Sequence, residues 1–263
     1  MREDIKKVII DALGKPNRTN CYMTFGELER KFGEKRLELV WSKDLVIFVE
    51  KKNRYYELYY FLNDGWEYFS DWDIIKVQLN KYDMISLQTV NRSLDGDCYI
   101  AEKLAFYYYK TYLRKQYINK TLQKYNESID VDWAVEEDNR IILDLLYETF
   151  DVLSDNLVDE FELTRMIRGQ QVLKIEIAGK IQGVILFEDV GVKSYVRAVC
   201  VAKSVQNKGL GHALLARYYN LHLDKTKLFY LWVDRDNKNA MKLYDKFGYK
   251  SDGLVNHIYI REK

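Results

Sequence analysis

The residues of this 263-residue chain that could do chemistry lie near its C-terminal end. The loop Gln206-Asn207-Lys208-Gly209-Leu210-Gly211 lies between an expected strand, 194–202, and an expected helix, 209–223. The first turn of a helix has unpaired backbone N–H groups and about half a positive charge, and glycines let an anion approach those groups closely. The loop and the first turn, as far as His212, therefore predict a binding site for a phosphate or diphosphate.

A second pattern begins 26 residues after that loop and follows an expected strand, 228–233. It reads Asn237-x-x-Ala240-x-x-Leu243-Tyr244-x-x-x-Gly248-Tyr249, and its apolar residues share one face of an expected helix, 238–247. Asn237 stands next to the start of that helix, so it binds a cofactor or simply caps the helix. Tyr244 lies on the apolar face, so its hydroxyl does chemistry or only bonds a neighbour.

In this order and spacing, the two patterns resemble the Gcn5-related N-acetyltransferase (GNAT) family over about residues 129–263. The resemblance implies a mixed, largely antiparallel sheet of the acyl-CoA N-acyltransferase type, with acetyl-CoA as cosubstrate. The pantetheine arm would lie between strands 194–202 and 228–233, and loop 206–211 would hold the pyrophosphate. Backbone N–H groups of Cys200 and Val201 would bind the thioester carbonyl, where losing one preorganised donor typically costs about 3 kcal/mol.

Two positions depart from the family's usual loop. Lys203 stands where proline is common, and Asn207 stands where glycine is frequent. Neither change removes a backbone N–H group. The loop lysines, Lys203 and Lys208, either add positive charge toward the CoA phosphates or face solvent.

The resemblance also assigns catalytic roles. Tyr244 matches the tyrosine that protonates the departing CoA thiolate, and a phenol with a pKa of about 10 is acidic enough because thiolate is a good leaving group. For the base that deprotonates the amine, the sequence favours Glu188 or Asp234 at strand ends. The remaining candidates are Asp189, His257 and a chain of water molecules. A thiol nucleophile at Cys200 is unnecessary, because an amine attacks the thioester directly.

The acceptor is predicted to be a small cationic amine. The segment before the second helix of the domain carries five carboxylates, which are Asp151, Asp155, Asp159, Glu160 and Glu162. Such a run attracts a cation, although it is also typical of a solvated helix face. Ribosomal-protein acetylators of the family have a glutamate where this chain has Trp232, which argues against a peptide terminus as substrate.

The chain is expected to form two α/β domains, 1–128 and 129–263. In the first, we expect helices at 3–13, 24–32 and 101–124 and strands at 36–41, 45–50, 55–62 and 84–90. In the second, we expect strands at 131–135, 172–177, 182–188, 194–202, 228–233 and 254–260, and helices at 138–150, 158–167, 209–223 and 238–247. The first domain is interpreted as a degenerate copy without a glycine loop or as a recognition module. It would supply packing, pocket walls or contacts in a homodimer.

Composition excludes several other classes. Lysine and arginine number 41 and aspartate and glutamate 40, so the net charge of +1 provides no polycationic surface for nucleic acid. Lysines and tyrosines interleave over 101–124, which would suit RNA, but packing of that helix on the strands is the preferred interpretation. No apolar run is long enough to cross a membrane, three cysteines fit neither a disulfide framework nor a zinc site, and the expected location is the cytoplasm.

The sequence therefore predicts an N-acetyltransferase that moves an acetyl group from acetyl-CoA to a primary amine by direct attack, without a metal. The alternative is a non-catalytic protein that binds acyl-CoA and has a regulatory role.

Overall fold

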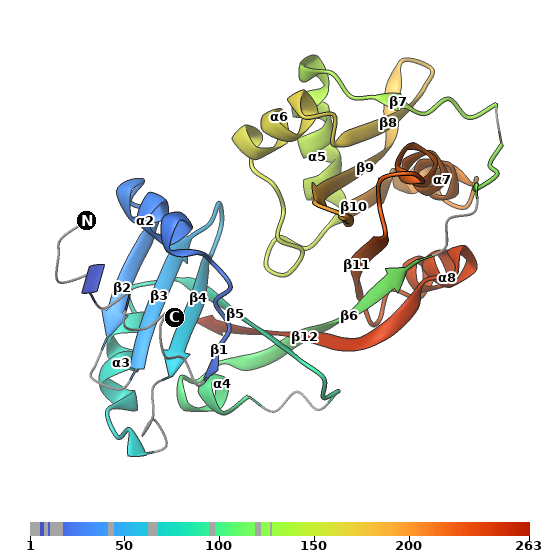
Figure 1. Cartoon of the computed structure of the whole chain (residues 1–263). Helices are drawn as coiled ribbons and strands as arrows, with labels where there is room; N and C mark the ends of the chain where they lie inside the picture. The colour runs from blue at the N-terminus through green and yellow to red at the C-terminus, as the bar shows by residue number, and fades with distance from the viewer. Residues whose placement is uncertain are drawn as a thin grey trace. The chain divides into compact units, whose positions relative to one another are not determined.

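The chain folds into two compact units. The computed structural model describes residues 6, 7, 10, 18–41, 45–62, 68–94, 98–118, 122–126 and 128–263. Unit 1 comprises residues 1–111 and 255–263, and unit 2 comprises residues 112–254. In each unit, helices lie on both faces of a sheet (Figure 1).

The sheet of unit 1 is mostly antiparallel. Its strands are, in spatial order, β2 (Leu37–Trp41), β3 (Leu45–Lys51), β4 (Tyr56–Leu62), β5 (Met84–Asn91) and the end of β12 (Lys250–Glu262). Only β4 and β5 run parallel, and the short strand β1 (Arg18–Thr19) also pairs with β4. One face of the sheet packs against α2 (Phe25–Gly33), and the other packs against α3 (Trp72–Leu79) and α4 (Tyr99–Lys103).

The start of α2 follows directly from local sequence. The Thr24 side chain accepts a hydrogen bond from the Glu27 backbone N–H at 3.3 Å, and the Glu27 carboxylate accepts one from the Thr24 N–H at 2.7 Å. This reciprocal capping satisfies two N–H groups that the first turn would otherwise leave unpaired. Leu28 anchors the helix in the core, where it is fully buried.

Unit 2 has a larger sheet with the same kind of organisation. Its strands are, in spatial order, β6 (Tyr107–Tyr117), β11 (Leu228–Asp234), β10 (Lys193–Val201), β9 (Lys180–Val190), β8 (Val172–Ile177) and β7 (Asp132–Trp133). Only β10 and β11 run parallel. The helices α5 (Asn139–Thr149) and α6 (Glu160–Arg168) pack on one face, and α7 (Leu210–His222) and α8 (Lys238–Phe247) pack on the other (Figure 1).

The two units repeat one order of elements. Three antiparallel strands are followed by a helix, a strand parallel to the third strand, a second helix and a last strand. The last strand is exchanged, because β6 from the first repeat pairs with β11 in unit 2 and β12 from the second repeat pairs with β5 in unit 1. The predicted mixed, largely antiparallel α/β fold is confirmed. The N-terminal half repeats the order of strands and helices found in the C-terminal half.

The predicted helix over 101–124 is wrong. The chain forms α4 and then the strand β6, which reaches Tyr117. Apolar residues four positions apart satisfy a helical face, but four is an even number and therefore also fits one face of a strand. Tyrosine and threonine favour strands, and the partner strand β11 lies more than 100 residues away in the sequence.

Two basic residues of this segment form ion pairs within the chain. Lys115 is buried and pairs with Asp245, and Arg114 binds Asp252 at 2.6 Å. The pairing of β6 also means that the predicted boundary at 128 differs from the division between the units, which falls at 111 and 112.

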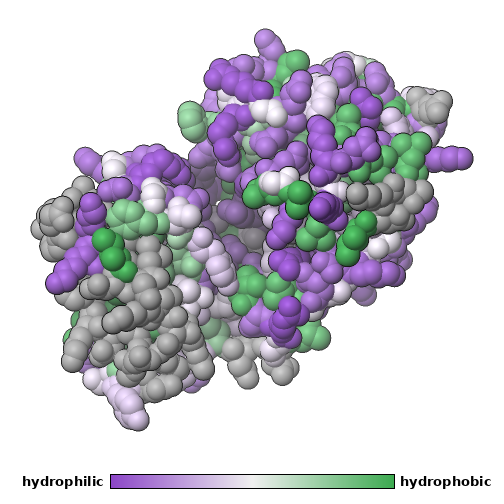
Figure 2. Space-filling model, in the orientation of Figure 1, coloured by the Kyte–Doolittle hydropathy of each residue, from purple (hydrophilic) through white to green (hydrophobic). Residues whose placement is uncertain are grey.

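Most other predicted elements are confirmed to within a few residues, whereas α3 was not predicted. The predicted helix at 3–13 lies largely outside the described residues. Among the described helices, none is long and apolar enough to cross a membrane. Hydrophilic residues cover most of the described surface seen in Figure 2.

The strand exchange makes a prediction about dividing the chain at residue 128. A fragment 129–263 lacks β6, so β11 becomes an unpaired edge and Tyr117 is lost from the core. We expect this fragment alone to show no cooperative thermal transition by circular dichroism, whereas coexpressed 1–128 and 129–263 copurify and melt cooperatively. A fragment 129–263 that melts at the temperature of the full chain would contradict this expectation.

Candidate functional site

The parallel strands of unit 2 separate part of the way along their length. Pairing runs from Lys193 with Leu228 to Val196 with Leu231, after which both strands continue without any recorded pair. A bulge at Arg197 starts the separation, because the register of β10 against β9 shifts between Val196 and Ala198. The ladder therefore opens into a gap whose β10 edge has unpaired backbone groups.

The register of β10 shows which amide groups face this gap. The Ala202 N–H donates to the Gln182 carbonyl of β9 at 2.8 Å. Because successive N–H groups along a strand point to opposite sides, the Cys200 amide also points toward β9 and the Val199 and Val201 amides point toward the gap. Of the two predicted donors, Val201 therefore has its amide on the gap side and Cys200 does not; the other amide on the gap side is that of Val199.

The Cys200 side chain is also unsuited to nucleophilic attack. It is fully buried, and its thiol lies 3.7 Å from the Leu145 carbonyl oxygen of α5. Burial raises the pKa of this thiol to about 11, so it stays protonated at neutral pH. Cys200 is therefore a packed residue of the strand.

The predicted phosphate loop ends at the first turn of α7. Asn207 and Gly209 have left-handed backbones, with φ values of 62° and 84°. A left-handed backbone is the conformation for which glycine is best suited and which asparagine tolerates, so Asn207 is a compatible departure from the family pattern. Residues 206–209 are exposed, and Lys203 and Lys208 face solvent.

The backbone N–H groups of this loop have no partner within the described chain. None of the residues from Asn207 to His212 donates a recorded backbone hydrogen bond, and no side chain caps α7. The first N–H that is satisfied belongs to Ala213, which donates to the Gly209 carbonyl at 3.0 Å. A helix start with free, exposed donors and no cap is a suitable site for an anion.

The helix α8 borders this helix start. A Cβ added to Gly211 would lie 3.3 Å from the Leu243 side chain, so the glycine permits close packing of α7 on α8. His212 packs its ring on Phe247, with centroids 4.6 Å apart, and burial lowers the pKa of His212. Asn237 accepts a hydrogen bond from the Ala240 N–H at 3.0 Å and therefore caps α8.

Tyr244 lies on the buried face of α8. Its ring contacts Tyr249 edge-on with centroids 5.6 Å apart, and the residue is 7% exposed. Its hydroxyl makes no recorded hydrogen bond to another described residue. Burial, reinforced by Tyr195, raises the pKa of Tyr244 well above its ordinary value. The phenol therefore remains protonated at neutral pH and can donate a proton or a hydrogen bond.

The model of the acetyltransferase (GNAT) family matches residues 139–249. The C-terminal half contains a GNAT-family domain. No curated protein sequence matches the chain. Several solved structures share its fold over most of its length.

Three of these structures illustrate the likeness. A GCN5-related N-acetyltransferase from Sphaerobacter thermophilus has 14% identity and a TM-score of 0.60, covering 92% of this chain and 86% of that one. A GNAT-family acetyltransferase from Colwellia psychrerythraea has 14% identity and a TM-score of 0.56, covering 100% and 98%. A tandem GNAT protein from the clavulanic acid biosynthesis pathway has 10% identity and a TM-score of 0.58, covering 86% and 83%.

Of the base candidates in the GNAT domain, Glu188 is held in an ion cluster. It lies 2.5 Å from Arg197, which also binds Glu162 at 2.9 Å and the Asn156 carbonyl at 3.1 Å. Burial would lower the pKa of the Arg197 guanidinium, but the carboxylates of Glu162 and Glu188 raise it. Arg197 lies at the bulge, so its ion pairs orient Glu188 beside the point where β10 and β11 separate.

Asp234 ends β11 in a turn. Its carboxylate accepts a hydrogen bond from the Asp236 N–H at 2.9 Å, and its carbonyl accepts one from the Asn237 N–H at 3.0 Å. His257 belongs to unit 1, where its ring contacts the Thr111 hydroxyl and the Ser93 carbonyl, each at 2.9 Å.

Asp189 serves the packing of α7 on the sheet. Its two carboxylate oxygens lie 2.6 Å from the Ser194 hydroxyl and 3.0 Å from the His222 Nε2. The Tyr218 hydroxyl completes the cluster by donating to Ser194. These contacts lie on the face that carries α7, opposite to the face of Glu188, since adjacent residues of a strand point to opposite faces.

An aromatic surface adjoins the gap on the face that carries α5 and α6. Tyr195 and Tyr230 stack with centroids 5.0 Å apart and an interplanar angle of 13°. The Arg114 guanidinium lies 5.9 Å from the Tyr230 ring centroid and 6.0 Å from that of Trp232. This surface was not predicted from the sequence. Side chains alternate between the two faces of β11, but the sequence does not show that α7 covers the face with Phe229, Leu231 and Val233 and leaves the other face open.

Several carboxylates of the acidic segment 151–162 make contacts that stabilise the fold. Asp159 caps α6 by accepting from the Glu162 N–H at 2.8 Å, and Asp155 accepts from the Asp151 N–H and the Tyr112 hydroxyl, both at 2.7 Å. Glu162 pairs with Arg197. Within the described residues, no group of three or more histidine, cysteine or acidic side chains could hold a metal ion.

Asp189 yields a prediction about stability and pH. Burial would raise its pKa, but hydrogen bonds from His222 and Ser194 hold it below the ordinary value of 3.8. A carboxyl whose pKa is lowered by folding stabilises the protein above its unfolded pKa and loses that effect as the pH falls through its folded pKa. We expect Asp189→Asn to lower the free energy of unfolding at pH 7 by about 1 kcal/mol, a modest value because the side chain is partly exposed.

Urea denaturation at pH 7 and below pH 4 measures this effect. The difference between the original protein and Asp189→Asn should shrink as the pH falls, whereas the exposed Asp224→Asn serves as a control with little effect at either pH. An equal difference at both pH values would show that the Asp189 charge does not contribute.

Proposed function

We propose that the GNAT domain transfers an acetyl group from acetyl-CoA to a primary amine by direct attack. The observation that supports this most is the run of unpaired N–H groups from Asn207 to His212, next to a gap between two parallel strands. The loop binds the cosubstrate's diphosphate, and the gap receives its pantetheine arm. A run of free donors beside an open strand edge suits one extended ligand with an anionic end.

The backbone of β10 supplies the site for the thioester. In the proposed arrangement, the Val199 and Val201 amides donate to pantetheine and to the carbonyl oxygen, which becomes an oxyanion when the amine attacks. The bulge at Arg197 holds these donors in place before the reaction starts. Collapse of the tetrahedral intermediate then breaks the bond from carbon to sulfur.

Tyr244 provides the proton for the departing thiolate. Its neutral phenol donates that proton as the C–S bond breaks, and solvent returns one after product release. The amine loses its own proton to Glu188 or Asp234, the two acidic residues proposed as bases. The ion pair with Arg197 orients the Glu188 carboxylate beside the gap.

The acceptor is proposed to be a small cationic amine. In the ion pairs beside the gap, three carboxylates face two guanidinium groups, because Asp252 pairs with Arg114 while Glu162 and Glu188 share Arg197. Tyr195, Tyr230 and Trp232 add aromatic faces, which attract cations. This surface replaces the simple acidic run as the argument for a cationic acceptor.

Binding of CoA is tested at Gly209. A β-branched side chain is strained at a φ of 84°, so Gly209→Val should distort the loop and weaken CoA binding at least about tenfold in calorimetry. Gly179→Val is the matched control, because Gly179 also has a positive φ of 72° and open space around it but lies in the turn between β8 and β9. The control should lose similar stability and keep its affinity for CoA.

Catalysis is tested at Tyr244. Tyr244→Phe removes only the hydroxyl, so kcat should fall roughly 100-fold while the CoA Kd changes by less than about twofold. Tyr147→Phe, on α5, is the control and should leave kcat unchanged. The assay uses acetyl-CoA with a panel of cationic, neutral and anionic amines, and we expect the cationic members to have the highest kcat/KM.

The same assay separates the proposal from its alternative. If CoA binds with wild-type affinity but no amine in the panel is acetylated, the chain is a non-catalytic protein that binds acyl-CoA. If Tyr244→Phe retains full kcat, another group protonates the thiolate.

A further inference from the structure

Unit 1 contains a second pair of parallel strands that separates in the same way. Pairing of β4 with β5 runs from Tyr56 with Ile85 to Leu58 with Leu87, and both strands then continue to Leu62 and Asn91. The end of the ladder in unit 1 thus corresponds to its end at Val196 and Leu231 in unit 2. The gap in unit 1, however, is occupied.

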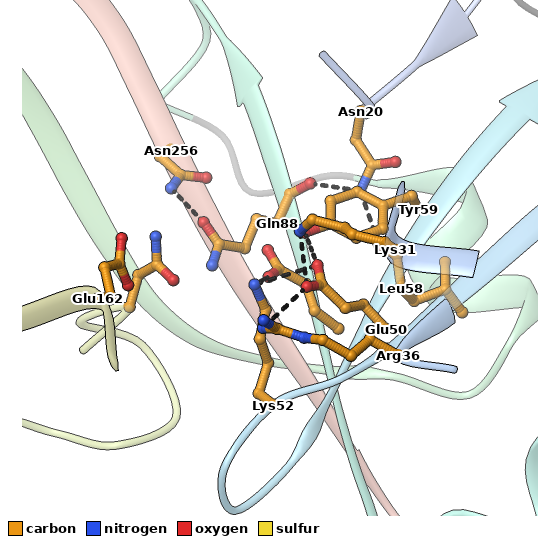
Figure 3. A network of polar contacts seen from close by, with 12 residues as sticks. Asn20, Lys31, Arg36, Glu50, Lys52, Leu58, Tyr59, Gln88, Glu162 and Asn256 are labelled. Atoms are coloured by element: carbon orange, nitrogen blue, oxygen red, sulfur yellow. Dashed lines mark hydrogen bonds and ion pairs between the residues drawn. The ribbon is translucent and has the colours of Figure 1, made fainter. Parts of the chain in front are cut away.

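The side chain of Asn20 bridges the two separating strands. Its Nδ2 donates to the Leu58 carbonyl of β4 and to the Gln88 carbonyl of β5, each at 2.9 Å. Its Oδ1 accepts from the Tyr60 N–H at 2.8 Å. Figure 3 shows Asn20 reaching toward Leu58 and Gln88 from its own segment of the chain. One carboxamide therefore satisfies the backbone groups at which the ladder ends.

The preceding residues extend this contact along β4. Arg18 and Thr19 form β1, which pairs antiparallel with Leu62 and Phe61. The Thr19 hydroxyl also donates to the Tyr60 carbonyl at 2.6 Å. Residues 18–20 consequently use the edge of β4 that corresponds to the free edge of β10. In unit 2, no described strand pairs with β10 in that place.

The acidic residue of unit 1 that corresponds to Glu188 is also engaged. Val49 faces Leu58 as Phe187 faces Val196, so Glu50 occupies the position of Glu188. The Glu50 side chain is fully buried and lies 2.6 Å from Lys31 and 3.1 Å from Lys52 (Figure 3).

The Glu50 carboxylate also accepts from the Tyr59 hydroxyl at 3.1 Å. Burial would raise the pKa of Glu50, but Lys52 and Lys31 hold it below its ordinary value. A buried carboxylate with this many partners is a structural ion and is not available as a base.

We infer that the gap of unit 1 is filled by residues 18–20 of its own chain, so that unit 1 is a non-catalytic copy and each chain binds acyl-CoA in unit 2 alone. The statement about acyl-CoA rests on the proposed function, whereas the filled gap stands on the hydrogen bonds of Asn20. Displacing Asn20 alone would leave two carbonyls and one N–H of the separated strands without this partner, which disfavours an exchange for an outside ligand.

The stoichiometry of CoA binding tests the inference on the full chain. Calorimetry should give one CoA per chain for the original protein, and this single site should weaken at least about tenfold in Gly209→Val. Two CoA per chain in the original protein, one of them retained at full affinity in Gly209→Val, would overturn the inference while leaving the proposed function intact. If the original protein binds no CoA, the proposed function fails. Hydrogen exchange at Tyr60, described next, then tests by itself whether residues 18–20 fill the gap.

Amide hydrogen exchange tests the filled gap without any ligand. The Tyr60 N–H should be protected in the original protein, and Asn20→Ala should accelerate its exchange at least tenfold, whereas Asn126→Ala in a turn of unit 2 should not. Asn20→Asp provides a second variant, which keeps an acceptor for Tyr60 but places a carboxylate against two carbonyl oxygens. Rapid exchange of Tyr60 in the original protein, or no acceleration in either Asn20 variant, would overturn the inference.

Discussion

The structure depends on a parallel ladder that stops before its strands end. A strand that leaves its partner exposes N–H and carbonyl groups, and each buried group without a partner costs about 1–3 kcal/mol. Such an edge must therefore find other partners. In unit 2 the edge of β10 beyond Val196 faces a gap beside the uncapped start of α7, and in unit 1 the edge of β4 beyond Leu58 is satisfied by Asn20 and β1. One fold thus leaves a strand edge open in one unit and satisfies the equivalent edge in the other.

Exchange of the last strand makes each unit incomplete without the other repeat. β6 comes from the first repeat but pairs with β11, and it contributes Arg114 and Tyr112 to the surface where the acceptor is proposed to bind. β12 returns to pair with β5, and its His257 and Tyr259 are buried in unit 1. The N-terminal repeat therefore contributes to unit 2 through strand pairing.

Equivalent acidic residues have different fates because their neighbours differ. Glu50 and Glu188 hold the same position in the two repeats, but Glu50 is enclosed by lysines and Tyr59, whereas Glu188 has one arginine partner and is partly exposed. Asp189, next to Glu188 in the chain, points to the opposite face and fastens α7 through His222 and Ser194. Residue type alone does not distinguish a base from a structural ion, since burial and charge partners come from distant segments.

By itself, the sequence determined the elements that depend on local interactions. These are the capped helix α2, the glycine loop before α7, the cap of α8 and the alternating strands of both repeats, because propensity, capping and turn chemistry act over a few residues. The tertiary structure decided what depends on partners far away in the chain. It turned 107–117 into a strand by pairing it with β11, assigned the gap-facing amides to Val199 and Val201 through the β9 register, and filled the gap of unit 1 with residues 18–20. The side-chain pattern of one segment does not show which distant segment it will pair with, because hydrogen bonds between strands join backbone groups whatever the side chains are.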